Sequence, residues 1–341
     1  MSTIPALRQD IMDACQLYVD NLIKPLHSLG KLEDMAVRIA GATGEVRPKS
    51  LSKAIVIFAG DTAVDGDNKT KGELSRAETK LVAAGAAPVS VLARNLGCPV
   101  YVIDVGLQKD MSDTPGVLVQ KVCRGTRKEG GAMTREAAAE AVSLGMSVAN
   151  TLAQSGVRAV GLGNIGERGV LSALSVTCAI MKEELQEASA RGGFQIRLAD
   201  IGNFAEDPVG VLADVGSAEI AALFGLVVGA ARHGMLIVFD NAVTGAAALA
   251  ACEVYPEIKN YIFPSVAYDE PVHMMQLRRL GFSAYLHYDV TAAQGVGSAL
   301  GLLLFDAALD MLNEMKTFGS ANVAVAEDGP GKGRQREDVR S

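Results

Sequence analysis

Five short apolar runs rich in β-branched residues, separated by helical stretches, constrain the fold of this chain most. Runs of this length are typical of strands buried on both faces of a parallel sheet. Helices between them would cross over and cover the sheet. The pattern predicts an α/β protein with a doubly wound parallel sheet and a ligand site at the carboxyl ends of the strands. The runs are AIVIFAG (54–60), PVYVIDVG (99–106), VRAVGLG (157–163), MLIVFDN (235–241) and NYIFPS (260–265).

The helical stretches divide the chain further. Residues 6–42 have helical spacing interrupted at Lys24-Pro25, and Thr134 and Gly156 mark the beginning and the end of one long helix. The polar, glycine-rich end of the chain is typical of disorder. We predict a small helical domain from residues 1–45 and 298–326, a Rossmann-like α/β domain over 46–297, and a disordered tail over 327–341. The other helices are expected at 73–97, 169–188, 217–234 and about 298–318.

Composition excludes several classes of function. The 341 residues carry a net charge of −7, which argues against nucleic-acid binding. The five cysteines form no CxxC pair and the four histidines have no metal spacing, so we expect a reducing cytoplasm, no metal and no disulfide framework. The apolar run 220–231 is too short to cross a bilayer, and no membrane association is expected.

Three loops carry residues that could bind a ligand. GLGNIG (161–166) matches the dinucleotide pattern G-x-G-x-x-G, but no acid follows at the end of a second strand, which favours a tight βα turn without a nicotinamide cofactor. The acidic loop 60–73 lacks the ligand set of a calcium loop. The basic loop 123–135 is equally consistent with a phosphate clamp and with a solvated surface.

The stretch AAQGVGSAL (292–300) places Gln294 at the entrance of a turn opened by Gly295 and Gly297, just before an apolar helix. Such a turn suits an anion or a reacting group. The side chain at its entrance is an amide, which forms hydrogen bonds but takes no proton at neutral pH. The turn is therefore either a binding site or an active site without a base.

Six further stretches occur in this order: LIKPLHSLGKLE (22–33), VYVIDVG (100–106), RGT and AMTRE (124–136), GAARHGMLIVFDN (229–241), AALAAC (247–252) and YLHYDVTAAQGVGSAL (285–300). Together they resemble the nicotinate-nucleotide–dimethylbenzimidazole phosphoribosyltransferase family. The resemblance extends from about residue 20 to 318. It implies a doubly wound sheet with a small helical domain, a dimer, and transfer of phosphoribosyl from nicotinate mononucleotide to an aromatic base without a cofactor.

The resemblance also shows which polar groups are replaced. Gln294 occupies the position of the family's catalytic glutamate, and Asn164 that of a nucleotide-binding glutamate. The family's Gly-Gly-Phe becomes GSA (216–218), and its Ala-Asp-His-Gly becomes AGDTA (59–63). The vestigial nucleotide-site positions are Gly163, Asn164, Gly166, Gly216, Gly295 and Gly297.

These coordinated losses predict a catalytically inactive subunit that pairs with an active homologous chain, as the B subunit does in heterodimeric enzymes that activate phenol or p-cresol for phenolic cobamides. An alternative is an active transferase with an altered base, for which Asp61 and Glu78 are weak candidates. A third hypothesis is a non-catalytic protein that binds a nucleotide or an aromatic ligand.

Overall fold

The computed structural model describes residues 3–62, 72–123, 131–182, 202–267, 270–290 and 292–340. Contacts divide the chain into an α/β unit, residues 1–4 and 52–301, and a helical unit, residues 5–51 and 302–341. The boundary falls inside one long helix, after Gly301.

Six parallel strands form the sheet of the α/β unit, in the order β3-β2-β1-β4-β5-β6. The chain runs outward from β1 to β3 and then returns to add β4 beside β1. The connectivity therefore reverses between β1 and β4, which is where ligands bind in sheets of this kind. The strands are β1 Lys53–Gly60, β2 Val100–Gly106, β3 Val117–Val119, β4 Ala159–Ile165, β5 Leu236–Phe239 and β6 Ile262–Pro264.

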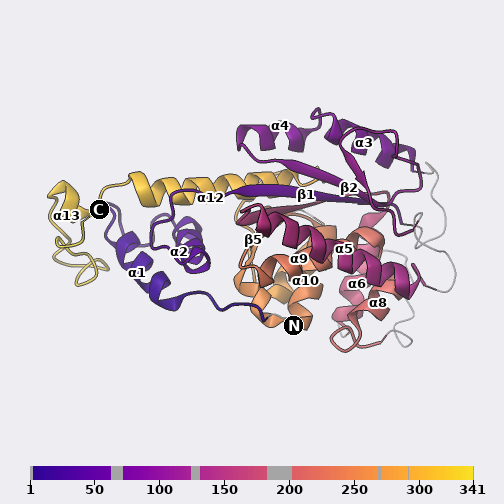
Figure 1. Cartoon of the computed structure of the whole chain (residues 1–341). Helices are drawn as coiled ribbons and strands as arrows, with labels where there is room; N and C mark the ends of the chain where they lie inside the picture. The colour runs from indigo at the N-terminus through magenta and orange to yellow at the C-terminus, as the bar shows by residue number, and fades with distance from the viewer. Residues whose placement is uncertain are drawn as a thin grey trace. The chain divides into compact units, whose positions relative to one another are not determined.

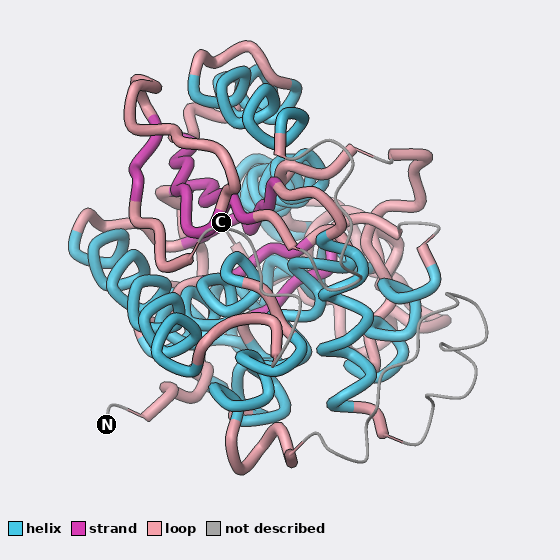
Figure 2. Tube along the Cα trace, turned by 90° about the vertical axis from the view of Figure 1, so that its right-hand side faces the viewer, coloured by secondary structure: helices cyan, strands magenta, loops and turns pink. Residues whose placement is uncertain are grey.

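The predicted doubly wound α/β fold is confirmed. β1 is buried from its second residue onward, as expected for a strand covered on both faces. In Figure 1, α3 and α4 lie over one face and α5 and α9 over the other. Figure 2, turned by 90°, shows helices on both sides of the strands. The helices are α3 Glu73–Ala83, α4 Pro88–Asn95, α5 Arg135–Gln154, α6 Gly169–Ile180, α8 Pro208–Val215, α9 Ala218–Arg232, α10 Ala242–Val254, α11 Pro271–Leu280 and α12 Val296–Glu314, with a 3-10 turn η2 Pro256–Asn260.

The single helix expected over 73–97 is two helices. Gly85 adopts a left-handed φ of +73°, and Pro88 begins the second helix at a position that needs no N–H donor. The stretch AAGAAP therefore forms a turn between α3 and α4. The predicted helix 169–188 is confirmed as far as Ile180, and its part from residue 183 onward lies outside the described residues.

The helices α5 and α9 pack with their backbones in contact. A Cβ added to Gly145 in α5 would lie 1.9 Å from the carbonyl oxygen of Ala222, and one added to Gly225 would lie 2.1 Å from that of Val142. Only glycine permits this approach. α9 is therefore fixed against α5 along its length, and its first turn is fixed at the edge of the sheet.

The helical unit contains α1 Gln9–Asp20, α2 Lys31–Thr43 and α13 Phe318–Ala321, with the end of α12. A buried ion pair joins Lys24 and Glu33, with 3.0 Å between Nζ and Oε2. Composition predicts disorder after residue 326. In the structure, the Gln335 side chain donates to the Lys24 carbonyl at 3.1 Å, and the Thr317 hydroxyl to the Val339 carbonyl at 2.8 Å. These contacts connect the tail to the unit, and the disorder of residues 327–341 stays a prediction.

Among the residues that the structure describes, one helix is long and apolar enough by composition to cross a membrane. It is α12, and 61% of the apolar window is buried in the structure, as in the core helix of a soluble protein. The run 220–231, which is the most apolar in the sequence, lies inside α9 and is buried.

Candidate active site

The carboxyl ends of the strands carry buried polar side chains around the point where the connectivity reverses. Asp61 follows β1, Asn164 lies near the end of β4, and Asp240 follows β5. All three are at most 5% exposed. Parallel neighbours bring their carboxyl ends to one edge, so residues far apart in the sequence meet here.

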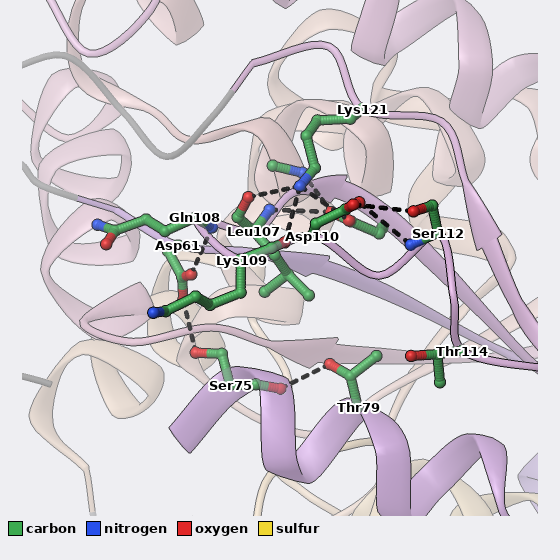
Figure 3. Close-up of polar contacts among 12 residues, drawn as sticks. Asp61, Ser75, Thr79, Leu107, Gln108, Lys109, Asp110, Ser112, Thr114 and Lys121 are labelled. Carbon is green, nitrogen blue, oxygen red and sulfur yellow. Dashed lines mark hydrogen bonds and ion pairs between the residues drawn. The ribbon is translucent and has the colours of Figure 1, made fainter. Parts of the chain in front are cut away.

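Asp61 holds this edge together. Its carboxylate accepts hydrogen bonds from the Ser75 hydroxyl at 2.5 Å, the Gln108 N–H at 2.9 Å and the Glu167 N–H at 3.1 Å. Figure 3 shows the bonds from Ser75 and Gln108. Asp61 thus joins α3 to the loops after β2 and β4. Both carboxylate oxygens are occupied, which is the arrangement of a structural anchor more than that of a base.

A second anchor fixes the loop after β2. Asp104, fully buried, accepts from the Leu107 N–H at 2.9 Å and lies 3.2 Å from Lys121 Nζ. Lys121 also donates to the carbonyls of Leu107 and Lys109, at 2.8 and 2.9 Å. Burial raises the pKa of Asp104, and the Leu107 N–H and Lys121 oppose that rise. Together these bonds position Gln108, which in turn orients Asp61.

The turn at 294–297 is clamped onto β4 and β5. The Ser298 hydroxyl donates to the carbonyls of Leu162 and Val238 at 2.7 and 3.1 Å, and its N–H donates to Asp240 at 3.3 Å. A Cβ added to Gly163 would lie 3.1 Å from the backbone nitrogen of Gly295, so β4 and the turn touch through their backbones. Burial raises the pKa of Asp240 to about 7. Gly297 fits closely as well, since a Cβ there would lie 2.6 Å from that of Asp240.

Gln294 adopts an unusual backbone conformation, with a φ of +67°. Residues other than glycine rarely occupy this region, and they gather at functional sites when they do. Its side-chain amide lies near the carboxyl of Glu78 on α3 and favours the charged form of that carboxyl. Burial raises the pKa of the half-buried Glu78; the amide of Gln294 opposes the rise, and nearby Glu167 adds to it.

Asn164 is hydrogen-bonded to a protein neighbour. The Asn241 side chain donates to Asn164 Oδ1 at 3.0 Å, and Asn241 caps α10 together with Thr244. The amide at 164 is thereby fixed between β4 and α10.

The glycine motif at 161–166 is not a βα turn. Gly161 and Gly163 lie inside β4 and pair with Ile55 and Ile57 of β1. Gly166 follows the strand, and a Cβ there would lie 1.9 Å from the Gly60 carbonyl. The expected turn is wrong because the strand continues through the first two glycines, and the missing side chain of Gly163 permits the contact with the 294–297 turn.

Most of the predicted positions gather at this edge of the sheet. Gly216 lies apart, between α8 and α9, and leads into the first turn of α9. Of the loops considered from sequence, residues 63–71 and 124–130 lie outside the described residues.

Sequence reasoning missed Asp240, Glu167 and Glu219. Asp240 directly follows a predicted strand, a signal that could have identified it. Glu219 stands alone before a long apolar run, and its burial could not be deduced from that pattern. It is 0% exposed, and burial raises its pKa to about 8.

A separate group lies in the helical unit. One ligand atom each from Asp20, His27 and Glu33 lies within 4.8 Å of the others. The ammonium of Lys24 already neutralises Glu33 at 3.0 Å. That cation opposes a metal ion at the same place.

Comparison with known proteins agrees with this architecture. A phosphoribosyltransferase family model matches residues 4–323. The chain is 34% identical over 344 residues to the nicotinate-nucleotide–dimethylbenzimidazole phosphoribosyltransferase of Geobacter sulfurreducens, covering 96% of this chain and 98% of the relative. It is 36% identical over 329 residues to that of Geotalea uraniireducens, covering 92% and 94%.

A solved structure supports the same assignment. The crystal structure of the corresponding enzyme from Thermus thermophilus matches with a TM-score of 0.83 and 30% identity, over 93% of this chain and 99% of that one. The candidate site lies at the carboxyl ends of the strands, where a fold of this kind predicts it. The match with the solved structure extends across both units. The chain belongs to the nicotinate-nucleotide–dimethylbenzimidazole phosphoribosyltransferase family.

Proposed function

We propose that this chain is the non-catalytic subunit of a heterodimeric phosphoribosyltransferase, paired with a homologous active chain. The complex would transfer phosphoribosyl from nicotinate mononucleotide to a phenolic or benzimidazole base, for the lower ligand of a cobamide. One observation carries the proposal. The positions where the resemblance implies glutamates, 164 and 294, both hold amides; Asn164 is hydrogen-bonded to Asn241, and Gln294 lies near Glu78.

The chemistry requires a proton acceptor. A lone pair on a phenol oxygen, or on the unprotonated ring nitrogen of a benzimidazole, attacks C1′ of the nucleotide. Nicotinate leaves with the electrons of the broken bond, and the phenol O–H, or the N–H at the other ring nitrogen, loses its proton. A general base in the right place contributes roughly 10²–10⁴ in rate. The amide of Gln294 cannot accept this proton. Asp240 and Ser298 still hold the turn in place, so the shape of the site is retained although the acceptor is not.

The decisive experiment is a transfer assay with phenol and with dimethylbenzimidazole, on this chain alone, its homologous partner alone, and the two together. We expect no turnover by this chain alone and a gain when it is added to the partner. Full activity of the purified chain as a homodimer would refute the proposal. Tight binding of nicotinate mononucleotide by calorimetry, without turnover in any mixture, would favour a ligand-binding protein.

Restoring both carboxylates tests the cause of the inactivity. The double variant Asn164→Glu/Gln294→Glu should raise transfer by the isolated chain above background, by up to roughly 10²–10⁴. Gln154→Glu, which adds a carboxylate at an exposed position on α5, is the matched control and should leave the rate unchanged. If the double variant stays at background, positions other than 164 and 294 limit the site as well.

A second candidate function is that of an active transferase in which Glu78 is the base. The proximity of Glu78 to Gln294 favours it, because it places a carboxyl beside the position of the missing one. The raised pKa of Glu78 predicts a rate that increases with pH as this carboxyl ionises. Glu78→Gln would then abolish turnover by the isolated chain, whereas Glu140→Gln on the exposed face of α5 would not.

A further inference from the structure

The end of the chain folds back onto the helical unit, where a buried amide holds its backbone. The Asn21 side chain is 0% exposed. Its Nδ2 donates to the Arg334 carbonyl at 3.3 Å, and its Oδ1 accepts from the Arg336 N–H. The amide therefore pairs with the backbone on both sides of the residue between them. Figure 1 shows the tail, in yellow, beside α13.

The short helix α13 contacts the same segment of the tail. A Cβ added to Gly319 would lie 2.2 Å from the carbonyl oxygen of Glu337 and 2.6 Å from that of Val339. Thr317, which caps α13, donates from its hydroxyl to the Val339 carbonyl at 2.8 Å. The backbone of the tail thus lies directly on the backbone of α13, at a distance that only glycine permits. Contacts of this kind supply affinity for a peptide, and buried side chains supply specificity.

One polar side chain of the tail is buried in these contacts. Gln335 is 7% exposed, and its Nε2 donates to the Lys24 carbonyl at 3.1 Å. The charged side chains on either side of it are exposed: Arg334, Arg336, Glu337 and Asp338. A buried amide with a matched acceptor distinguishes one peptide from another, whereas solvated charges do not. Gln335 is therefore the anchoring side chain of the tail.

The stretch 21–24 lies between the tail and the residues before α13. On one side, the Ile23 N–H donates to the Lys316 carbonyl at 2.9 Å. On the other side, the Lys24 carbonyl accepts from the tail. The ammonium of Lys24 also forms the buried ion pair with Glu33. A docked tail therefore holds in place the segment that leads into this pair.

The free energies of the docked and the free tail lie close together. Each hydrogen bond contributes modestly, because water replaces it in the free tail. Ordering the backbone of residues 331–339 costs conformational entropy at every position. An exposed ion pair such as that of Arg336 with Asp338 adds little. A second peptide of the same sequence can therefore compete for the same contacts.

We propose that Asn21, Lys24, Thr317 and Gly319 form a peptide-binding site on the helical unit, the tail site. Residues 331–339 of the same chain occupy it reversibly, with Gln335 as the anchor. The ligand class is a polar peptide that is bound through its backbone and one glutamine side chain. The occupied site acts as a strap over the stretch 21–24. The inference is independent of the proposed function, because none of these residues belongs to the candidate active site.

Limited trypsin digestion of the full-length chain measures how often the tail is free, because cleavage after Arg334 or Arg336 requires release of the backbone. Gly319→Ala places a methyl group against the tail carbonyls, although alanine favours α13 itself. We expect this variant to lose its tail about tenfold faster than the wild-type chain. Ala324→Val, at an exposed position after α13, is the control and should match the wild-type rate.

Displacement is tested with a fluorescent peptide of residues 329–340, by anisotropy on full-length variants. Gln335→Ala removes the anchor from the chain's own tail and leaves the tail site intact. The peptide should bind this variant about tenfold more tightly than it binds the wild-type chain, whose own tail competes at high effective concentration. Adding Gly319→Ala to this variant should abolish binding, and a peptide with alanine in place of the glutamine should bind about tenfold more weakly.

Three results would overturn the proposal. If trypsin removed the tail of the wild-type chain as fast as that of Gly319→Ala, and as fast as it cuts the free peptide, the tail would be disordered. Absence of binding to the Gln335→Ala chain at millimolar peptide would make the tail a fixed part of the fold. Protection of the wild-type tail that increased with chain concentration would place the tail of a second copy in the site.

Discussion

The middle and the first turn of α9 have opposite effects on the stability of the fold. Its middle packs against α5 through glycines so tightly that a single added carbon would enter the neighbouring backbone. Its first turn carries Glu219, fully buried and without hydrogen-bond partners among the described residues. Close packing stabilises a fold, and an unsatisfied buried acid destabilises it. One helix thus contains both a rigidly packed segment and a buried acid at the edge of the sheet.

This contrast explains how the edge can hold an unsatisfied acid. The contact between α5 and α9 fixes the position of the first turn, so Glu219 cannot swing out to solvent without moving the whole helix. Binding groups held by rigid elements need little rearrangement when a ligand arrives. The turn after residue 293 is also fixed by supporting residues, because Asp240 and Ser298 hold the backbone beside Gln294 in place.

The largest effect is expected from disrupting the contact between α5 and the middle of α9. Gly145→Ala places a methyl group 1.9 Å from the Ala222 carbonyl, so α5 and α9 must separate. We expect the free energy of unfolding to fall by about 3–5 kcal/mol, as for severe overpacking. Chemical denaturation monitored by circular dichroism measures it. Ser143→Ala, exposed on the same helix, is the control, and a loss below about 1 kcal/mol for Gly145→Ala would contradict the packing argument.

An intermediate effect on stability is expected at the first turn of α9, and it depends on pH. The pKa of Glu219 is raised in the folded chain, from 4.5 to about 8. The folded state therefore binds more protons than the unfolded state between these values, and stability decreases as pH rises through this range. Asp240, raised from 3.8 to about 7, acts in the same direction.

Glu219→Gln removes one of these two groups. At pH 9 the variant should be more stable than the wild-type chain by about 1–3 kcal/mol, and at pH 4 the two should be similar. Denaturation midpoints across this pH range, with Glu140→Gln as the control, provide the measurement. If the difference between Glu219→Gln and wild type did not change with pH, Glu219 would already have a charged partner in the folded chain.

Sequence patterns predicted the scaffold better than the site. The strands β1, β2, β4, β5 and β6 each overlap a predicted apolar run, because strands buried on both faces need continuous apolar side chains. The three-residue edge strand β3 is too short and too exposed to leave such a signal. The turn between α3 and α4 was missed because Gly85 and Pro88 lie inside an otherwise helical pattern.

The site required contacts that no local pattern encodes. Gln294 was identified through a resemblance, and its neighbour Glu78 lies more than 200 positions earlier in the sequence, on α3. Whether Glu78 acts as a base stays a prediction. The burial of Glu219 depends on Gly60 and Gly169, which belong to two other elements. Tertiary contacts of this kind set the chemistry of the edge.

The smallest effect is expected where α5 begins, and it separates packing from helix capping. Thr134 accepts a hydrogen bond from the Ala137 N–H at 3.1 Å and caps the helix. Thr134→Ala should lower the free energy of unfolding by about 1 kcal/mol, whereas Thr134→Ser should leave it nearly unchanged. The ratio of this loss to that of Gly145→Ala compares two contributions to the free energy of unfolding, that of the N-terminal cap of α5 and that of its contact with α9. Equal losses in the two variants would mean that α5 is held by its cap as much as by its glycine contact, and the rigid support inferred for the first turn of α9 would need another origin.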